Sequence, residues 1–309
     1  MNLKLKVVTP SGRERYLRLL SHYVLGSPEV TEWQLWDNCR TDSDRAYLEQ
    51  LAASDPRCVI KRLPSADGST RNIGDFFRFC DDTEALYLRL DDDIVFTEPG
   101  FFERFKQRVL AARGEALWFS PLVVNNAICS ALIQNLSKVR VEGPITMQAM
   151  DPFSWAHASF PIAMHPVLME AARRGRLDDF RVPDREVRGG RFSINAIAFF
   201  GDEIAALGDL FEPPNQNEEE WYSAVLPVKL NRPGKILGDL LVSHFSFYTQ
   251  EQELLETDIL EDYYRLAGLP TSDLTKPKPK RHGLRRLLWQ LRKQRQRGPV
   301  PAYSISLAD

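Results

Sequence analysis

Four short apolar segments alternate with segments of helical periodicity over the first 90 residues, and this alternation constrains the fold more than any other feature. Apolar strands separated by helices of about ten residues are typical of βαβ units, which build a mostly parallel sheet flanked by helices. The sequence therefore predicts an α/β fold. The expected strands are residues 3–8, 33–36, 58–60 and 85–90, and the expected helices are residues 16–24, 44–51 and 71–80.

The second half of the chain has a less regular pattern. Residues 121–190 show little periodicity, so no element is predicted there. We interpret residues 1–270 as one folded domain and residues 271–309 as an appendage, which is an ordinary division for a chain of this length. Further helices are expected at residues 101–112 and 251–266, and further strands at residues 117–119, 193–200 and 235–247.

The appendage differs from the rest of the chain in charge. Residues 276–309 contain ten Lys or Arg residues and one acid, which leaves residues 1–275 with 30 basic and 41 acidic side chains. A Lys- and Pro-rich start is followed by leucines at helical spacing among arginines. This pattern is typical of a linker and a basic amphipathic helix on an anionic membrane surface, with residues 276–297 as the expected contact. A tail that is only solvated is the alternative.

Cysteine usage and hydropathy indicate the compartment. The four cysteines are scattered without a paired C-x-x-C spacing, which fits free thiols in a reducing cytosol. The N-terminus has no apolar signal segment, and no apolar run approaches the ~20 residues that span a bilayer. We therefore expect a cytoplasmic protein that is soluble or peripheral at the inner face of the membrane.

Three consecutive acids, Asp91, Asp92 and Asp93, follow the fourth expected strand. Adjacent carboxylates repel one another and lose hydration at the end of a buried strand, so a cation is expected to offset them. Side chains two residues apart in an extended chain share a face, which lets Asp91 and Asp93 act together while Asp92 points elsewhere. The pattern favours a divalent metal held by carboxylates and substrate phosphates, with a solvated acidic turn as the alternative.

Four motifs occur in the order in which a known superfamily has them. Residues 7–10 (VVTP) resemble its opening strand, and residues 36–42 (WDNCRTD) resemble its second-strand loop. Residues 71–74 (RNIG) resemble the turn before its fourth strand, and residues 90–93 (LDDD) stand where it keeps its D-x-D motif. The chain thus resembles the GT-A superfamily of nucleotide-sugar glycosyltransferases, especially the inverting, family 2-like members that build bacterial polysaccharides. This resemblance implies a GT-A, Rossmann-like sheet.

The resemblance also implies a site at the carboxyl ends of the strands. A late histidine in that family often completes the metal site, and residues 242–245 (VSHF) offer one, although a core histidine is the simpler interpretation without the resemblance. Because a neutral imidazole suits Mn²⁺ whereas oxygen ligands favour Mg²⁺, the implied cofactor is Mn²⁺ or Mg²⁺. The implied donor-binding residues are Thr9, Pro10, Asp37, Arg71, Asn72, Asp91 and Asp92, and the implied metal ligands are Asp91, Asp93 and His244.

An acidic segment further along the chain supplies the implied catalytic base. Residues 217–221 (NEEEW) resemble the family's x-E-D element, whose final acid takes a proton in inverting members. That match makes Glu220 the implied base and Glu219 the reserve. The alternative is an acidic first turn that complements the helix dipole.

The implied function is metal-dependent, inverting transfer of a sugar, such as a hexose, from a nucleotide-diphosphate donor, UDP or similar, to a glycan or lipid-linked acceptor. Residues 1–100 are then the nucleotide-binding half and residues 101–270 the acceptor half. No nucleic-acid partner is expected. Aromatic residues that could stack on sugar rings, although such residues are more often core, are Trp118, Phe153, Trp155 and Trp221.

Other functions share single features with this sequence. Asp91-x-Asp93-x-Val95 also matches the nucleophile motif of haloacid dehalogenase-type phosphatases, in which Asp91 would be phosphorylated, but that motif normally follows the first strand. A sugar-phosphate nucleotidyltransferase would need a Gly-rich loop after the first strand, and residues 9–13 (TPSGR) lack one. A non-catalytic, membrane-associated binding protein is the third alternative.

Overall fold

The four strands expected in the first 90 residues all form and pair in parallel. A computed structural model describes residues 3–69, 72–212, 217–274 and 300–308. Its first half contains β1 (Lys4–Ser11), α1 (Glu14–Gly26), β2 (Val30–Asp37), α2 (Asp42–Ser54), β3 (Cys58–Lys61), a 3-10 helix (Ile73–Phe79) and β4 (Ala85–Leu90). The spatial order is β3-β2-β1-β4. The third connection is a 3-10 helix where the pattern predicts an α-helix.

Local sequence explains these elements. The apolar face of α1 is buried, as residues at helical spacing on a surface helix should be. Thr41 caps α2 by accepting a hydrogen bond from the backbone of Asp44 at 3.2 Å, which satisfies an N–H that the helix leaves free. Every residue of β4 is buried, as expected for a strand covered on both faces.

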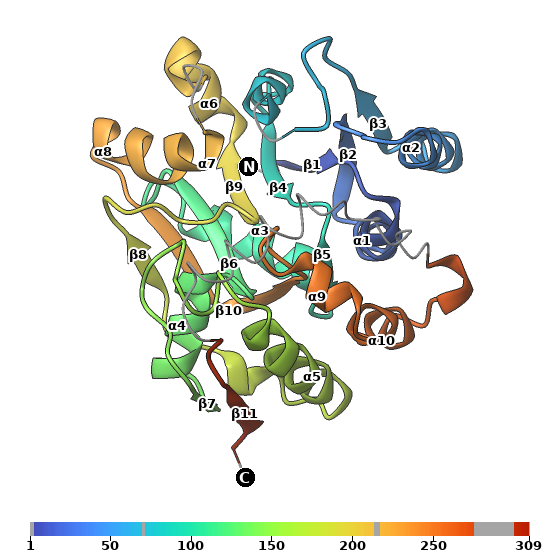
Figure 1. The fold of residues 1–309 in the computed structure, drawn as a ribbon. Coiled ribbons are helices and arrows are strands. Elements are labelled where there is room, and N and C mark those ends of the chain that lie inside the picture. The colour runs from blue at the N-terminus through green and yellow to red at the C-terminus, as the bar shows by residue number, and fades with distance from the viewer. Residues whose placement is uncertain (1–2, 70–71, 213–216, 275–299, 309) are drawn as a thin grey trace, which may run out of the picture.

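The second half completes one nine-stranded sheet. It adds β5 (Ile94–Thr97), β6 (Trp118–Val124), β8 (Arg185–Val187), β9 (Ala196–Phe200) and β10 (Gly234–His244). β9 runs antiparallel between β4 and β6, whereas β6 and β10 continue the parallel direction. β5 and β8 pair antiparallel with opposite ends of β10. The result is the predicted α/β fold, a mostly parallel central sheet flanked by helices (Figure 1).

The helices of the second half include elements that the sequence pattern does not predict. α3 (Phe101–Ala111) matches its expected range, and the expected helix at 251–266 is divided into α9 (Glu251–Leu255) and α10 (Ile259–Leu266). α4 (Ala127–Leu136) is buried over its first seven residues, so it has no polar face to produce a helical period. The remaining helical elements are α5 (Ser159–Arg173), α6 (Gly201–Leu207), α7 (Glu218–Glu220), a π-helix (Trp221–Val225), α8 (Leu226–Leu230) and the 3-10 helices Leu177–Phe180, Gly208–Phe211 and Thr271–Asp273.

The end of the chain returns to the domain. β11 (Ser304–Leu307) pairs antiparallel with β7 (Val139–Glu142) in a second, two-stranded sheet (Figure 1). Tyr303 packs against Phe160 and donates a hydrogen bond to the backbone oxygen of Pro144 at 2.7 Å. The predicted boundary at residue 270 is therefore not the end of the folded chain. The basic stretch 276–297, for which membrane contact is predicted, lies outside the described residues.

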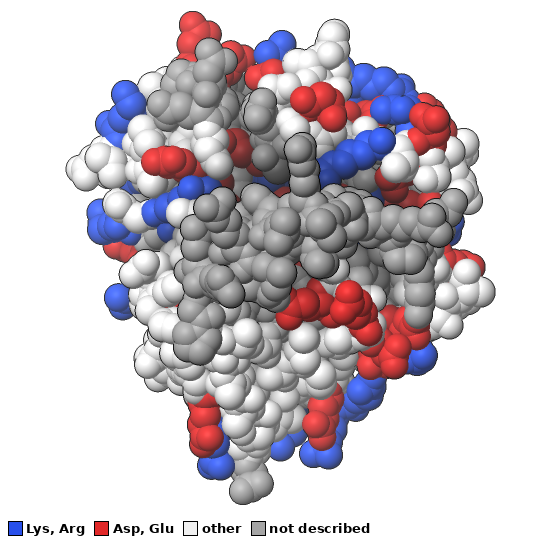
Figure 2. All heavy atoms as spheres, in the orientation of Figure 1, with Lys and Arg blue, Asp and Glu red and all other residues white. Residues whose placement is uncertain are grey.

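Charged side chains on the described surface are mixed in sign. Figure 2 shows acidic and basic residues interspersed across the described part of one face. Several form ion pairs with each other, such as Arg108 with Asp184 and Asp239. The four cysteines are buried and free. Within the described ranges, no helix has both the length and the apolar character needed to cross a membrane.

Candidate metal centre

Asp91, Asp93 and His244 converge at one edge of the sheet. Asp91 and Asp93 lie in the turn between β4 and β5, and His244 is the last residue of β10. The pairing of β10 with β5 fixes this approach, because the backbone N–H of Phe245 donates to the oxygen of Asp93 at 2.9 Å. One ligand atom from each of the three residues lies within 4.8 Å of the others. Among the described residues this is the single group of three metal-ligating side chains.

The orientation of His244 suits a metal ligand. Its Nδ1 lies 3.4 Å from the backbone oxygen of Asn125, which can only accept a hydrogen bond, so Nδ1 carries the proton. Nε2 then faces Oδ1 of Asp93 at 3.4 Å. Burial acts to lower the pKa of His244, but the charge and hydrogen bond of Asp93, the charge of Asp91 and the Asn125 backbone together raise it. A divalent ion would take the place of a proton on Nε2, since metal ligands bind in the deprotonated form.

Asp91 is held on both carboxylate oxygens. Oδ1 pairs with the Arg89 guanidinium at 2.9 Å, and Oδ2 accepts a hydrogen bond from the amide of Asn195 at 3.0 Å. The backbone N–H of Asp91 donates to the oxygen of Asn195 at 2.8 Å. Both partners come from neighbouring elements of the sheet, so the carboxylate is fixed in direction before any ligand binds.

Residues in the turn between β1 and α1 contact Asp92 and Asp93. Asp92 is not one of the three clustered ligands, and it accepts hydrogen bonds from the Gly12 backbone at 3.1 Å and from the Arg13 guanidinium. Arg13 also pairs with Asp93 at 2.9 Å. Burial acts to raise the pKa of Asp93, but Arg13 and His244 outweigh it and hold that pKa below its usual range. Guanidinium groups therefore offset part of the negative charge that the sequence leaves uncompensated.

Asp37 lies in a loop that is bound to the same turn. The backbone N–H of Asn38 donates to the oxygen of Ser11 at 3.0 Å, which joins the ends of β1 and β2. Asp37 pairs with Arg45 and Arg62, each at 3.2 Å. Burial acts to raise the pKa of Asp37, but hydrogen bonds from Cys39 and Arg45 lower it. The loops after β1, β2 and β4 thus meet, as expected at the carboxyl ends of parallel strands.

The other implied donor-binding residues lie further from the cluster or outside the described chain. Thr9 and Pro10 belong to β1, and the Thr9 hydroxyl accepts a buried hydrogen bond from the Trp33 indole at 3.0 Å. Asn72 donates to the backbone of Ser65. Among the described contacts, none links these three side chains to Asp91 or Asp93. Arg71 lies outside the described residues.

The acidic segment places a different glutamate at the site from the one that the resemblance implies. Glu220 is exposed, and among the described residues no contact joins it to the cluster. Glu219 pairs with Arg191 at 2.5 Å. Glu218 is buried and pairs at 2.8 Å with Arg89, which also holds Asp91.

Arg89 and Glu218 are the functional candidates that sequence reasoning missed. Arg89 is one charged residue in an otherwise apolar, fully buried strand, and that anomaly was the available signal. Burial raises the pKa of Glu218 to about 7.

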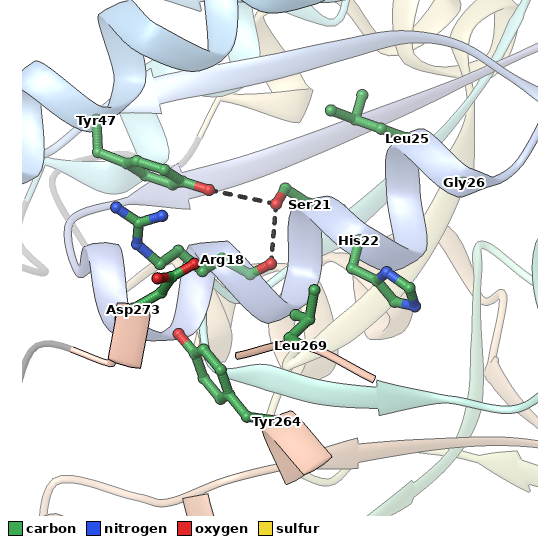
Figure 3. Close-up of a pocket in the computed structure, with 9 residues that line it drawn as sticks. All are labelled: Arg18, Ser21, His22, Leu25, Gly26, Tyr47, Tyr264, Leu269 and Asp273. Carbon is green, nitrogen blue, oxygen red and sulfur yellow. Dashed lines mark hydrogen bonds between the residues drawn. The ribbon is translucent and has the colours of Figure 1, made fainter. Parts of the chain in front are cut away.

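Two cavities lie away from the cluster. One of about 280 Å³ is lined by α1, by Tyr47 of α2 and by Tyr264 of α10 (Figure 3). In it the Tyr47 hydroxyl lies 3.3 Å from that of Ser21, so these polar groups satisfy each other. The second, of about 730 Å³, lies between α1 and the start of α3. Neither lining includes a residue of the cluster.

A search with the sequence finds no matching family model and no matching curated protein, whereas solved structures share the fold. The mannosyltransferase PcManGT from Pyrobaculum calidifontis, solved with GDP-Man and Mn²⁺, aligns over 95% of this chain and 80% of its own, with a TM-score of 0.50 and 10% identity. GalNAc-T7, solved with UDP, GalNAc and Mn²⁺, aligns over 86% of this chain and 48% of its own, with a TM-score of 0.46 and 10% identity.

A nucleotidyl-type enzyme is also similar: 4-diphosphocytidyl-2C-methyl-D-erythritol synthase from Anaerococcus prevotii aligns over 86% of this chain and 96% of its own, with a TM-score of 0.42 and 13% identity. At these identities a likeness shows the fold alone. The family 2-like assignment stays a prediction. The strand order and the likeness to the mannosyltransferase together show that this chain has a GT-A-like α/β fold.

Proposed function

We propose that this protein is a metal-dependent glycosyltransferase that moves a sugar from a nucleoside-diphosphate donor to a glycan or lipid-linked acceptor, with inversion. The observation that carries the proposal is the convergence of Asp91, Asp93 and His244 at the carboxyl edge of a GT-A-like sheet. Mixed oxygen and nitrogen ligands suit Mn²⁺, and Mg²⁺ is the alternative. A divalent ion held there would stabilise negative charge on a diphosphate leaving group.

The chain's own residues would orient the donor. Arg89 and Asn195 fix Asp91, and the backbone of Gly12 fixes Asp92, so the D-x-D turn is rigid. Asp37 lies in the adjoining loop and would contact the nucleoside. Contacts of the donor with Thr9, Pro10, Arg71 and Asn72 stay predictions of the family resemblance.

We assign the proton acceptor to Glu218 in place of Glu220. One oxygen of Glu218 pairs with Arg89, and the other has no hydrogen-bond partner among the described residues. That free oxygen can take the proton of an attacking hydroxyl, and a pKa of about 7 is well matched to a general base at neutral pH. Glu218→Gln should abolish transfer, whereas Glu220→Gln should leave it near the parent rate. The reverse ranking would return the role to Glu220, and loss in Glu219→Gln alone would give it to Glu219.

Thermal unfolding with nucleotide sugars tests the proposal as a whole. A ligand that binds only the folded state raises the melting temperature, so the correct donor should stabilise the protein in the presence of Mn²⁺ and do so weakly without it. Asp93→Asn should lose the shift. Asp239→Asn, a half-exposed acid paired with Arg108, should keep it. If no nucleotide sugar raises the melting temperature with Mn²⁺, or if Asp93→Asn responds like the parent, the proposal is wrong.

The phosphatase alternative fits the structure less well. A nucleophile of that type normally follows the first strand, whereas Asp91 follows β4. Release of phosphate from simple phosphomonoesters by the parent, lost in Asp91→Asn, would favour this alternative.

Membrane binding through residues 276–297 is a separate proposal, resting on the basic, leucine-containing sequence alone. Sedimentation with vesicles containing phosphatidylglycerol tests it, and binding should fall as salt rises.

A further inference from the structure

Three aromatic side chains form a chain of ring contacts that begins at His244, at the end of β10. The ring of Phe247 packs on that of His244, with centroids 4.7 Å apart. Trp155, from the loop before α5, has its ring centroid 6.1 Å from that of Phe247 and 5.5 Å from that of Tyr248. The planes of Trp155 and Tyr248 meet at 82°. We call Trp155, Phe247 and Tyr248 the aromatic corner.

A buried glutamine fixes this corner relative to the metal ligands. Gln250 is fully buried, and its amide nitrogen donates to the backbone oxygens of Ser154, at 2.5 Å, and His157. Its amide oxygen accepts from the backbone of Phe247 and from the side chain of Asn125, each at 3.0 Å. Asn125 is also the residue whose backbone oxygen orients His244. Gln250 therefore links the loop before Trp155 and the segment that carries Phe247 to Asn125, whose backbone orients His244.

The aromatic corner is partly exposed to solvent, whereas most large aromatic side chains of the core are buried. Tyr248 is 73% exposed, the largest fraction among the large apolar side chains of the described chain. Of the other aromatic candidates for sugar stacking, Trp118 and Trp221 are buried in the core. An exposed aromatic group that a buried hydrogen-bond network holds in place loses little conformational freedom when a ligand binds.

We propose that the aromatic corner binds a neutral pyranose ring of the acceptor, which makes the acceptor a glycan at the point of transfer. This inference rests on the proposed function and names its acceptor subsite. The C–H groups on one face of a pyranose carry partial positive charge, and the face of an aromatic ring is negative. In the described residues none of the cation–π pairs includes a ring of the corner. Contact of Phe247 with His244 would hold such a sugar beside the reacting carbon.

Saturation-transfer NMR on the full chain, without donor, tests this proposal with cellobiose, lactose, maltose and mannobiose as probes. At least one disaccharide should receive saturation on its ring C–H protons. Tyr248→Ala should raise the Kd of that disaccharide roughly twofold to tenfold, the size expected for loss of one stacking ring. Tyr248→Phe keeps the ring and should bind like the parent. Val228→Ala, at a side chain that is 63% exposed, is the matched control and should also bind like the parent.

The outcomes separate this proposal from the proposed function. Stabilisation by a nucleotide sugar with Mn²⁺ should be the same in Tyr248→Ala and the parent, because the corner is not part of the donor site. The proposal is overturned if no disaccharide receives saturation, or if Tyr248→Ala and Trp155→Ala both bind with the parent Kd. Saturation of the acyl chains of monomeric dioctanoyl-phosphatidylglycerol, in place of the sugars, would overturn it in favour of a lipid surface.

Discussion

The two sides of the proposed metal centre are built from different chemistry. On the side of β1 and β4, guanidinium groups hold the acids: Arg13 pairs with Asp93, and Arg89 pairs with Asp91. On the side of β6 and β10, neutral groups hold His244: the backbone of Asn125 accepts from its ring, and Phe247 packs on it.

This difference indicates which ligand each side would face. Fixed positive charge beside carboxylates suits a site where a metal and a diphosphate meet, because the ion and the arginines together balance several negative charges. Neutral amides and aromatic rings suit an uncharged sugar. Substitutions on the charged side should therefore impair metal and donor binding, and substitutions on the neutral side should impair sugar binding.

Asp93→Asn should have the largest effect, because it removes a metal ligand while preserving the shape of the side chain. We expect the rate of Mn²⁺-dependent transfer to fall by about 100-fold to 1,000-fold, the range seen when one stabilising group is removed from a transition state. Steady-state kinetics with the donor identified by thermal unfolding provides the measurement. A rate equal to that of the Asp239→Asn control would show that the charged side does not hold the ion.

Arg89→Met should be the most destabilising change on the charged side. Arg89 and Glu218 are both buried, and removal of one partner leaves a buried carboxylate unpaired. The free energy of unfolding should fall by about 3 kcal/mol or more, measured by urea denaturation. Adding Glu218→Gln to Arg89→Met should restore part of the loss. A double variant that is less stable than Arg89→Met would contradict the pairing.

Gln250→Ala breaks the neutral side instead. It removes the oxygen that accepts from the part-buried backbone N–H of Phe247 and one of the two acceptors of the Asn125 amide, which keeps its bond to the Phe245 oxygen. We expect a loss of about 2 kcal/mol in the free energy of unfolding, with weaker disaccharide binding, because the aromatic corner is no longer fixed. Mn²⁺ affinity should change less than in Asp93→Asn. Equal losses of metal and sugar binding would mean that the two sides are not independent.

The pH dependence of stability adds a gradual effect, which is small over any one pH unit. Burial raises the pKa of Glu218 to about 7, against an ordinary value of 4.5, so the folded state binds a proton more tightly than the unfolded state. Stability from this group is therefore greatest below pH ~4.5 and falls as the pH rises towards ~7, by at most about 1.4 kcal/mol per pH unit. Glu218→Gln should remove this slope. An unchanged slope in urea denaturation across pH 4.5 to 7 would contradict the assignment.

The first 90 residues were readable from sequence because each element there has its own pattern. Strands β1 to β4 are apolar and are separated by amphipathic helices, and parallel strands bring their carboxyl ends together, so the meeting of Asp37 with the acidic turn followed. α4 was not readable, because a helix buried on nearly all sides has no polar period. Contacts between residues far apart in the sequence could not be predicted either. Trp155 and Tyr248 are 93 positions apart in sequence and adjacent in space.

Glu218, Glu219 and Glu220 show why sequence alone could not identify every residue of the site. Three consecutive glutamates have the same chemistry, and sequence alone cannot say which one faces inwards. The start of α7 decides this: Asn217 caps the backbone N–H of Glu219, and the helix then turns Glu218 towards Arg89 and Glu220 towards solvent. His244 was identified through the family resemblance, because a histidine in a buried strand carries no signal of its own.

Electron paramagnetic resonance of Mn²⁺ can detect the proposed metal centre and its nitrogen ligand. Titration should show Mn²⁺ bound to the chain, and pulsed measurements should detect coupling to one imidazole nitrogen. Our account predicts that His244→Gln abolishes that coupling and that Asp93→Asn abolishes binding. Failure of the parent protein to bind Mn²⁺, or a nitrogen coupling that persists in His244→Gln, would contradict a metal centre at the end of β10.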